Sequence, residues 1–477
     1  MSMTGLRSLA GLCLPMLLAA CATQPPPAHV DAAAPARWNA PLPAAGDADL
    51  LPHQGTQGGL SAWWRQRSDP VLVELIESAQ AVSPTVAAAG SRIEQARAVQ
   101  VAAGATLLPS LGSSLSATKA GAQVGTPAGT SVSGALQAAW EIDLFGANRG
   151  ARDGATARFE GAQAGWHEAR VSVAAEVANV YYGARACALA LAVTRADATS
   201  RAETSRLSEL NAAAGFLAPA TAALARASAA EANARATQQE AQCDLDVKAL
   251  VALTGLAEAD VRGKLVAAPT ALPQDAPVAI AALPAQTLAQ RPDVYAAGRE
   301  VAAASAEVGS AQAQRFPRLS LNGSVGVASL RSGGVTTDLT TWSIGPLSLT
   351  LPLFDAGKRA ADVDAARARY DEAAARYRAS VRQAVREVEE ALVNLHSTGA
   401  RAGDAATAAN GYVASFAGTE SRYNAGLASL MELEESRRTR LAAELALVSL
   451  QRERVAAWVA LYRAAGGGWS ADAAPRP

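Results

Sequence analysis

Polar and apolar residues alternate with a period of two in two neighbouring segments of the second half of the chain. The apolar positions of the first segment are Leu319, Leu321, Val325 and Val327. In the second segment, from Thr341 to Phe354, the alternation slips by one residue at Gly345-Pro346 and then resumes. A period of two is typical of a strand with one apolar face, and a slip at Gly-Pro predicts a β-bulge. The pattern therefore predicts an amphipathic strand pair over about 317–354.

The first half of the chain contains a weaker version of this strand pair, over about 108–145. Five short landmarks recur in the same order in both halves. Among them, Pro84 and Pro292 lie 208 positions apart, and Gly215 and Gly426 lie 211 positions apart. Such regular recurrence indicates a tandem duplication. We expect two repeats, residues 61–270 and 271–470, and a short tail at 471–477.

A long helical segment follows each strand pair. Between Asp355 and Tyr423, small and apolar residues recur in steps of three and four, which indicates a coiled-coil seam. About 65 residues of continuous helix would span on the order of 100 Å. Breaks near Gly215 and Gly426 predict that each repeat ends in a helical hairpin. The alternative is a plain coiled-coil rod, and the repeated strand pairs argue against it.

Composition and charge exclude several classes of protein. The 477 residues are 50% hydrophobic but only 5% aromatic, because alanine, which favours long and closely packed helices, supplies most of the apolar share. The formal net charge is −1, so we expect no basic surface for nucleic acid. After the first twenty positions, no apolar run reaches the roughly 18 residues of a membrane-spanning helix, which argues against a multi-helix inner-membrane transporter.

The N-terminus carries the features of an export signal. Residues 1–20 contain Arg7, a short apolar run and small residues, as in a secretory signal peptide. Leu18-Ala19-Ala20-Cys21 resembles a bacterial lipobox, which implies cleavage before Cys21 and lipid (palmitate among it) on this residue. An ordinary signal peptide with a chance cysteine is the alternative. Residues 21–60 are rich in proline, so we expect an extended leader that begins at an acylated Cys21.

The two strand pairs give four amphipathic strands per chain. Such strands form either a small soluble sheet lying on the helices or a sheet that faces lipid. In lipid an open sheet edge is not tolerated, so the strands must close into a barrel. Four strands are too few, because transmembrane barrels begin at about eight. Closure therefore requires two or three copies, and the strand pattern leaves the choice between dimer and trimer open.

Several motifs together resemble the TolC/OprM family of outer-membrane efflux proteins, in its lipoprotein, NodT-type branch. They are Arg291-Pro292-Asp293-Val294, Arg315-Phe316-Pro317-Arg318-Leu319, Leu351-Pro352-Leu353-Phe354-Asp355-Ala356-Gly357, Arg422-Tyr423-Asn424-Ala425-Gly426 and Tyr462 to Trp469. The resemblance extends from Trp63 to Trp469. It implies an α+β membrane protein whose homotrimeric, twelve-stranded transmembrane β-barrel, with four strands per chain, continues into a periplasmic α-helical barrel.

The resemblance also implies a function. The chain would be a lipid-anchored exit duct in the outer membrane of a Gram-negative bacterium, passing drugs or other small molecules and so contributing to multidrug resistance. Its partners would be a periplasmic adaptor protein and an inner-membrane RND-type transporter. One alternative is a lipid-anchored coiled-coil adaptor or scaffold. A second alternative is the exit duct of a type I protein secretion system.

No constellation of residues points to catalysis. The four histidines, His29, His53, His167 and His396, are scattered, without metal-ligand spacing. Neither a nucleophile elbow nor a phosphate-binding loop occurs. We therefore expect neither an enzyme nor a cofactor or metal site.

By resemblance, a periplasmic gate is expected just after the second hairpin turn. Its carboxylates would be Glu432 and Glu435, its constriction residue Met431 and its latch tyrosine Tyr423. The family's latch arginine position holds Ala428, and Thr221 is the first-half counterpart of Glu432. Ser429 and Glu432 also fit a helix capping box, an alternative role for Glu432. For Glu434 we expect an exposed pair with Arg438.

The cysteines suggest a disulfide. If Cys21 is acylated, Cys187 and Cys243 remain in an oxidising compartment, and each lies 28 residues from Gly215. Antiparallel helices with arms of equal length bring both cysteines to the same height. We therefore expect a Cys187–Cys243 disulfide, with two buried free thiols as the alternative.

Overall fold

The structure, a computed structural model, describes residues 23–42, 64, 69–121, 128–269, 271–273, 288 and 291–469. The expected signal peptide (1–20), Cys21 and the tail (471–477) lie outside the described residues. The chain forms two compact units. Unit 1 comprises Met1–Ala32, Ser91–Gln163 and Tyr295–Ala379, and unit 2 comprises Ala33–Gly90, Ala164–Val294 and Ser380–Pro477. Each unit thus contains segments from both predicted repeats.

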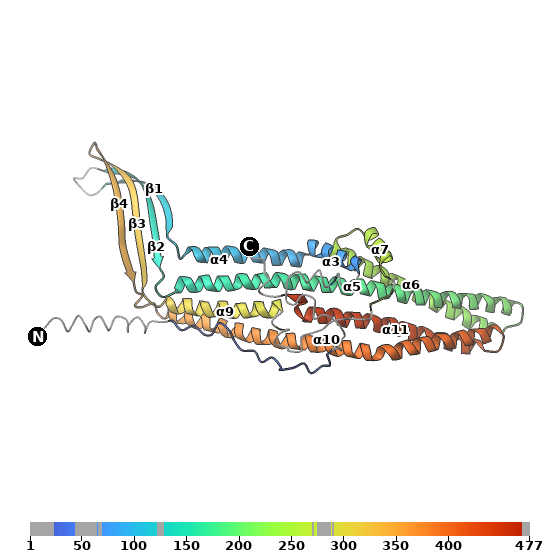
Figure 1. The fold of residues 1–477 in the computed structure, drawn as a ribbon. Helices are drawn as coiled ribbons and strands as arrows, with labels where there is room; N and C mark the ends of the chain where they lie inside the picture. The colour runs from blue at the N-terminus through green and yellow to red at the C-terminus, as the bar shows by residue number, and fades with distance from the viewer. Residues whose placement is uncertain are drawn as a thin grey trace. The chain divides into compact units, whose positions relative to one another are not determined.

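Unit 1 contains an antiparallel four-stranded sheet (Figure 1). Its strands are β1 (Ser110–Ala120), β2 (Gly129–Ile142), β3 (Arg318–Ser332) and β4 (Val335–Thr350), paired in the order β1-β2-β3-β4. β2 and β3, which come from different halves of the chain, pair from Ile142 and Leu319 to Gly129 and Ser332. The two predicted strand pairs are therefore halves of one sheet, and β1 and β4 are its edges.

The register of the sheet places most of its large apolar side chains on one face. Val325 of β3 lies between Leu136 of β2 and Trp342 of β4 on this face. The same face carries Leu111, Leu115, Val132, Trp140, Ile142, Leu319, Leu321, Val327, Ile344, Leu347 and Leu349. From Leu319 to Val327 the apolar positions extend over about 26 Å of strand. This length is comparable with the apolar band of transmembrane barrels, about 25 Å.

The opposite face of the sheet is polar and built from small side chains. Ser116 and Ser133 form a hydroxyl–hydroxyl hydrogen bond of 2.8 Å across β1 and β2. Ser324 and Ser343 do the same, at 2.8 Å, across β3 and β4. The predicted division of the strands into an apolar and a polar face is confirmed.

The predicted bulge is also confirmed. Leu321 lies opposite Leu347, and Gly323 lies opposite Ile344, so two residues of β4, Gly345 and Pro346, face the single Asn322. The extra residue shifts the sequence pattern by one position. It thereby keeps Ile344 and Leu347 on the same face of the sheet, although they lie three positions apart and would face opposite sides of a regular strand.

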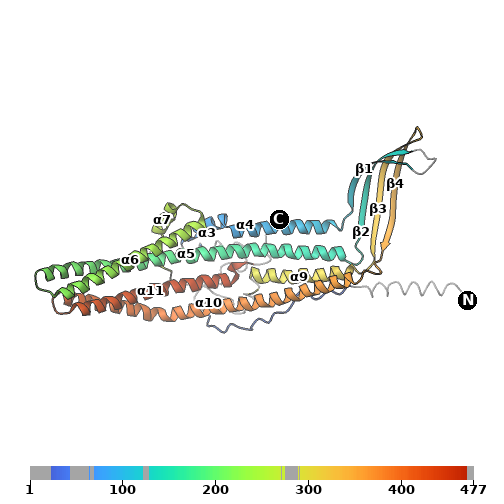
Figure 2. The same cartoon turned by 180° about the vertical axis from the view of Figure 1, so that it is seen from behind.

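In unit 1, helix α9 (Pro292–Ala313) lies between the first turns of α5 (Ala147–Ala213) and α10 (Lys358–Asn424), as both Figure 1 and Figure 2 show. Glycines of α5 allow close contact. A Cβ atom on Gly150 would lie 2.9 Å from the carbonyl oxygen of Ala306, and one on Gly154 would lie 3.3 Å from that of Ala303. On its other side, α9 packs against Ala373 of α10.

Helix α4 (Pro84–Ala105) is far less covered than α9, its counterpart in the duplication. Its contacts with α5 include a 3.2 Å hydrogen bond from Gln100 to Thr156 and the Arg97 guanidinium 5.7 Å from the Phe159 ring. None of residues 91–105 is buried, whereas Val301, Ala303, Ala304 and Val308 of α9 are.

The described part of the leader, residues 23–42, contains neither helix nor strand. In unit 1, the backbone of Gln24 exchanges two hydrogen bonds with the side chain of Gln312, of 2.9 and 3.2 Å. The hydroxyls of Ser305 and Tyr370 donate to the carbonyl oxygens of Pro26 and Pro27, at 2.6 and 3.0 Å. The proline-rich segment is therefore fixed along α9 and α10 by backbone contacts.

Unit 2 combines α3 (Pro70–Val82), α6 (Pro219–Thr254), α7 (Glu258–Ala267), α11 (Leu430–Ala464), the short 3-10 helix η1 (Gly466–Gly468) and the remaining lengths of α5 and α10. Its core contains a cluster of buried aromatic rings. The Trp64 ring lies edge-on to Trp458 and Tyr462, with centroids 5.7 and 5.0 Å away. Beside this core, the buried Asp69 accepts hydrogen bonds from Tyr181 and Arg185 of α5.

The close contact between α5 and α9 gives a stability prediction. Gly150→Ala should lower the free energy of unfolding by about 1–3 kcal/mol, because the added methyl group overlaps the backbone of α9. Gly411→Ala is the matched control, since no atom lies within 4 Å of its added Cβ and alanine favours a helix over glycine. Thermal unfolding of the two variants measures the difference. Equal or greater stability of Gly150→Ala would contradict the packing described.

Candidate functional site

The hairpin end of unit 2, residues 197–228 and 416–441, contains the residues expected to form a gate. Two turns lie within it. Helices α5 and α6 are joined at Gly215, with φ +80°, and α10 and α11 are joined at Gly426, with φ +75°. A positive φ is readily adopted by glycine, which explains why both turns are placed at this residue type.

Glu432 caps the start of α11. Its carboxylate accepts a hydrogen bond of 2.7 Å from the backbone N–H of Ser429, and its own N–H donates to the Ser429 hydroxyl at 3.2 Å. The hydrogen bond from the Ser429 backbone is the main cause that lowers the pKa of Glu432. Arg422 lies 3.7 Å away across the turn. The structure thus contains the capping box that the S-x-x-E pattern predicts.

The other expected gate residues differ in exposure. Glu435 is exposed and forms a 2.6 Å ion pair with Arg438. Met431 is 66% exposed. Tyr423 is half-buried and packs against the apolar cluster that includes Phe416 and Leu433.

The expected pair between Glu434 and Arg438 is wrong. Glu434 instead contacts Arg437 at 2.9 Å, and it accepts a 2.6 Å hydrogen bond from the Ser228 hydroxyl and another from Arg201. It lies on the side of α11 that faces α5 and α6, and its side chain is only 15% exposed. Arg438 lies on the solvent side of α11, where Glu435 is its partner.

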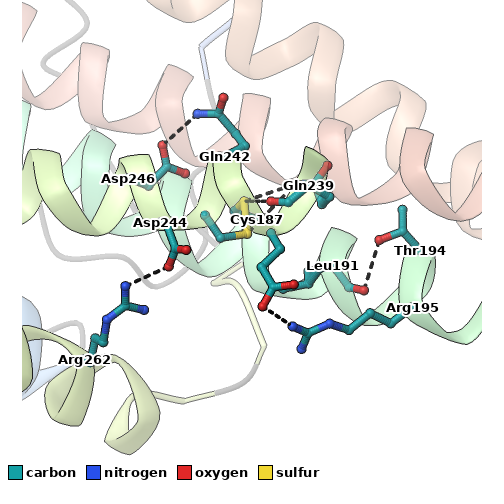
Figure 3. The surroundings of a disulfide bond; sticks show 11 residues. Cys187, Leu191, Thr194, Arg195, Gln239, Gln242, Asp244, Asp246 and Arg262 are labelled. Carbon is teal, nitrogen blue, oxygen red and sulfur yellow. Dashed lines mark hydrogen bonds and ion pairs between the residues drawn. A yellow bond between two sulfur atoms is a disulfide. The ribbon is translucent and has the colours of Figure 1, made fainter. Parts of the chain in front are cut away.

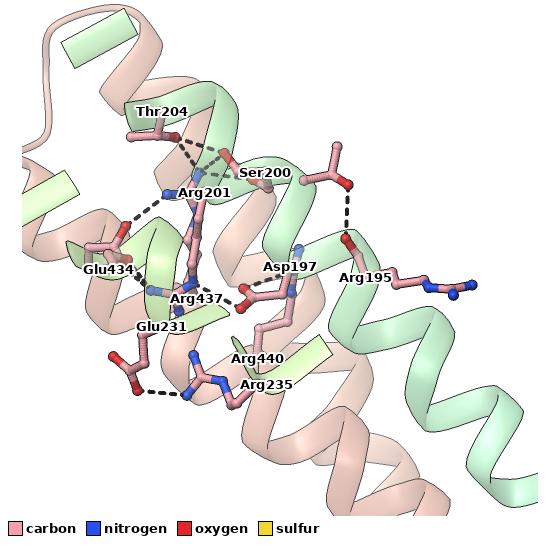
Figure 4. Close-up of polar contacts among 12 residues, drawn as sticks. Arg195, Asp197, Ser200, Arg201, Thr204, Glu231, Arg235, Glu434, Arg437 and Arg440 are labelled. Atoms are coloured by element: carbon pink, nitrogen blue, oxygen red, sulfur yellow. Dashed lines mark hydrogen bonds and ion pairs between the residues drawn. The ribbon is translucent and has the colours of Figure 1, made fainter. Parts of the chain in front are cut away.

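A buried polar network surrounds Glu434 (Figure 4). Arg437, whose side chain is 1% exposed, donates 2.9 and 2.7 Å hydrogen bonds to the hydroxyls of Ser200 and Thr204 on α5. Arg201 donates to Asp197, also 1% exposed, at 2.9 Å. Arg440 lies 3.8 Å from Asp197, and its guanidinium is 4.1 Å from the Phe416 ring centroid. Charged side chains of α5 and α11 thus neutralise one another in the interior.

The sequence contains a signal for this network in the residues of α11, although the expected pairing of Glu434 did not use it. Leu430, Leu433, Arg437 and Leu441 recur in steps of three and four, and all four are buried. An arginine in an apolar helical stripe predicts a buried partner, because a buried charge without one is costly. The partner's identity depends on which helices pack together, and this information is not local.

Within unit 2, a disulfide joins Cys187 of α5 to Cys243 of α6, with Cα atoms 5.5 Å apart (Figure 3). The side chain of Gln239 lies beside it and donates to the Cys187 sulfur at 3.0 Å. The half-buried bond lies between the aromatic core and the hairpin end.

Among the described residues, no group of three or more histidine, cysteine, aspartate or glutamate side chains is arranged to hold a metal ion. The site is therefore a set of hydrogen bonds and ion pairs between helices, next to two turns that expose Phe216 and Leu427.

Comparison with known proteins agrees with this architecture. Residues 75–256 and 283–467 both match the family model described as outer membrane efflux protein. The chain belongs to the outer membrane efflux protein family. The pyoverdine export outer membrane protein OpmQ of Pseudomonas aeruginosa is 30% identical, over 99% of this chain and 98% of its own length. Nodulation protein T of Rhizobium leguminosarum bv. trifolii is 27% identical, over 88% and 92% of the two chains.

Solved structures show the same fold. The Campylobacter jejuni CmeC outer membrane channel superposes with a TM-score of 0.84 at 23% identity, over 94% of this chain and 95% of that one. The efflux-family resemblance of the sequence, with its NodT-type branch, is thus confirmed. The chain is an outer-membrane channel for efflux and not an enzyme, and its location is the outer membrane of a Gram-negative bacterium.

Proposed function

We propose that three copies of this efflux-family chain form one channel, which serves as the exit duct of a tripartite pump for small molecules. The observation that supports this proposal best is the four-stranded sheet with one apolar face. Its edges, β1 and β4, have no further strand beside them among the described residues. In lipid, both edges need partners. Because adjacent strands are antiparallel, β4 of one copy has the direction needed to pair with β1 of the next.

The polar face of the sheet favours three copies over two. Two copies would give eight strands, and the interior of an eight-stranded barrel is just wide enough for side chains to fill. The inward positions here are mainly serine, threonine, alanine and glycine, such as Gly112, Ser133, Thr341 and Ser343. Side chains this small would leave the interior open. Twelve strands enclose a wider, water-filled lumen, which suits a conduit.

The internal duplication supplies a second argument for contact between copies. α4 and α9 both have 22 residues, and α5 and α10 both have 67. α9 packs between α10 and α5, whereas α4 contacts α5 and leaves its other side open. In the duplication, α4 corresponds to α9 and α5 corresponds to α10. α9 has both α5 and α10 as neighbours, so the neighbour that α4 lacks corresponds to α10 and is supplied by another copy. The α10 residues equivalent to Gly150 and Gly154 are Ala361 and Ala365, which are small and exposed.

Closure predicts a cross-link between copies. The Cβ of Ala306 would lie 3.8 Å from a Cβ on Gly154, which is the Cβ separation of a disulfide. By the repeat offsets of 208 and 211, Ala98 of α4 corresponds to Ala306 and Ala365 of α10 corresponds to Gly154. Ala98 and Ala365 are therefore the equivalent pair between copies. Ala98→Cys/Ala365→Cys should therefore give covalent dimers and trimers on non-reducing gels, while Ala98→Cys alone should give none. Monomers only, from chain that is correctly exported, would contradict the proposed closure.

The proposed partners are a periplasmic adaptor and an inner-membrane RND-type transporter, and the cargo is small molecules. The relative OpmQ, named for pyoverdine export, supports small-molecule cargo over a secreted protein. The hairpin turns expose apolar residues, Phe216 at 85% and Leu427 at 70%, which an adaptor could cover. Co-purification of an adaptor with the tagged chain from native membranes tests the assembly, and its absence from functional channels would contradict it.

We further propose that Cys21 is acylated and anchors the chain in the outer membrane. Gln24 is fixed to Gln312, six residues before β3 begins at Arg318. Three residues of extended chain reach at most about 11 Å, so an acyl group on Cys21 would lie close to the end of the sheet. Several acyl chains on one residue hold a protein stably in a bilayer.

Radiolabelled palmitate should be incorporated into the wild-type chain and not into Cys21→Ser. The substitution should leave folding intact, because Cys21 precedes every described contact of the leader. Equal labelling of both chains would contradict acylation at this residue.

The proposed gate places Glu432 and Glu435 near the axis of the trimer. Two carboxylates per chain would give a ring that attracts cations and repels anions. Met431, which is exposed in the single chain, would narrow the opening, and Tyr423 would hold the turn against α11. Glu435 is the better candidate for the ring, because the capping bonds already fix the carboxylate of Glu432.

Glu435→Ala should raise single-channel conductance in planar bilayers and antibiotic entry into cells, because the shorter side chain widens the constriction and the loss of its charge lowers the barrier to anions. Glu453→Ala is the matched control on α11, since this exposed residue pairs with Arg401 away from the turn. Unchanged conductance in Glu435→Ala would remove Glu435 from the gate.

A further inference from the structure

Two features of the first hairpin, its disulfide and its contact with Glu434, are related by geometry. We propose that the Cys187–Cys243 disulfide positions Arg201 and Ser228 as a joint hydrogen-bond donor site for the Glu434 carboxylate, and that this contact holds α11 closed against the first hairpin. The site formed by Arg201 and Ser228 is called the Glu434 socket below. Its role in closing the channel depends on the proposed function of the hairpin end, but its existence does not.

The socket is built from two helices whose relative height must be fixed. Arg201 lies 14 residues after Cys187 on α5, and Ser228 lies 15 residues before Cys243 on α6. At about 1.5 Å per residue, the two positions are about 21 and 22 Å from the disulfide. The disulfide therefore places them at nearly the same height on antiparallel helices.

The contacts within the socket require this alignment. Arg201 donates a 2.6 Å hydrogen bond to the Ser228 hydroxyl, and that hydroxyl donates a 2.6 Å bond to Oε2 of Glu434. Arg201 also donates to the same oxygen. The other carboxylate oxygen, Oε1, accepts from Arg437 at 2.9 Å. A slip of one residue between α5 and α6 would move the two donors about 1.5 Å apart along the axis, enough to break these bonds.

The rest of the contact between α5 and α6 supplies little to prevent such a slip. The buried residues of α6 that follow the turn are small: Ala222, Ala225, Ala232 and Ala236. The ion pairs that cross between the helices, Arg195–Glu240 and Arg226–Glu209, are largely exposed and therefore weak. The larger buried side chains of α6, Val247 and Leu250, lie beyond Cys243. Between the turn and these residues, the disulfide is the covalent constraint on the register.

Burial makes the contact of Glu434 strong enough to act as a restraint. The side chains of Arg201 and Arg437 are 7% and 1% exposed. If α11 moved away from α5, Arg201 would keep its pair with Asp197, but the bonds from Arg201 and Ser228 to Glu434 would break. Arg437 would lose its bonds to α5 as well, and breaking buried polar contacts of this kind is costly. The neighbouring Glu435–Arg438 pair, by contrast, lies in solvent and would be unaffected. Glu434 is therefore the positioning residue of this helix, and Glu435 is not.

Hydrogen exchange of the purified full chain in detergent tests the socket directly. Glu434→Gln should increase the exchange of backbone amides in 430–441 and 197–208 about tenfold or more, since it removes a buried charge from three hydrogen-bond donors. Glu435→Gln is the matched control and should leave exchange unchanged. Equal exchange in both variants would overturn the socket.

The disulfide is tested in the same experiment. Cys187→Ser/Cys243→Ser should raise exchange in 430–441, a segment that contains neither cysteine, and should add little when combined with Glu434→Gln. Wild-type chain denatured without reductant should contain no free thiol at these two positions. Free thiols there, or an effect of the double substitution confined to α5 and α6, would overturn the role of the disulfide. If the double variant does not fold, Ser228→Ala replaces it, with the same expected exchange in 430–441.

Channel recordings separate this inference from the proposed function. Glu434→Gln should increase the open probability of reconstituted channels, whereas conductance of the wild type only tests whether a channel forms. A wild type without any conductance, combined with the expected exchange pattern, would refute the channel and leave the socket intact. Conducting channels whose open probability is unchanged by Glu434→Gln would refute the role of the socket in closure.

Discussion

The structure depends on one constraint: the apolar face of the sheet must be kept from water while the backbone groups along β1 and β4 find partners. Neither need is met by the part of one chain that the structure describes. On the apolar face, Trp342 and Ile344 are 72% and 84% exposed. In a bilayer, lipid would cover both side chains. A single solution satisfies both requirements, which is a closed barrel in a bilayer made from several copies. In the helical part of unit 1, the exposed side of α4 and the exposed alanines of α10 likewise gain a partner only from another copy.

The local parts of this architecture were readable from the sequence. The strands were predictable because a period of two places Val325 and Leu321 on one side, whatever the strands pair with. The bulge at Gly345-Pro346 was predictable because it leaves a one-residue slip in the pattern. The hairpin turns carry glycine, and the S-x-x-E pattern at Ser429 and Glu432 marks a helix start. Each of these features depends on residues that are close in the sequence.

The network around Glu434 was not predictable in the same way. The exposed pair expected with Arg438 followed from helix spacing alone, but spacing does not say which side of α11 meets another helix. The packing against α5 and α6 turns Glu434 inward and leaves Arg438 to Glu435. The leader shows the same limit, because its prolines predict an extended chain, but not that Gln24 lies against Gln312. Contacts between distant segments depend on the fold, and the sequence of either segment alone does not encode them.

The most direct test of the central constraint compares the two faces of β4 in reconstituted bilayers. Spin labels at Ile344→Cys and Ser343→Cys, on neighbouring residues with side chains on opposite faces, report accessibility to oxygen, which concentrates in lipid, and to a water-soluble nickel reagent. The account predicts that the label at 344 is accessible to oxygen and protected from nickel, and that the label at 343 shows the reverse. Equal access of nickel to both positions would mean that the sheet does not lie between hydrocarbon and water, and would contradict the account.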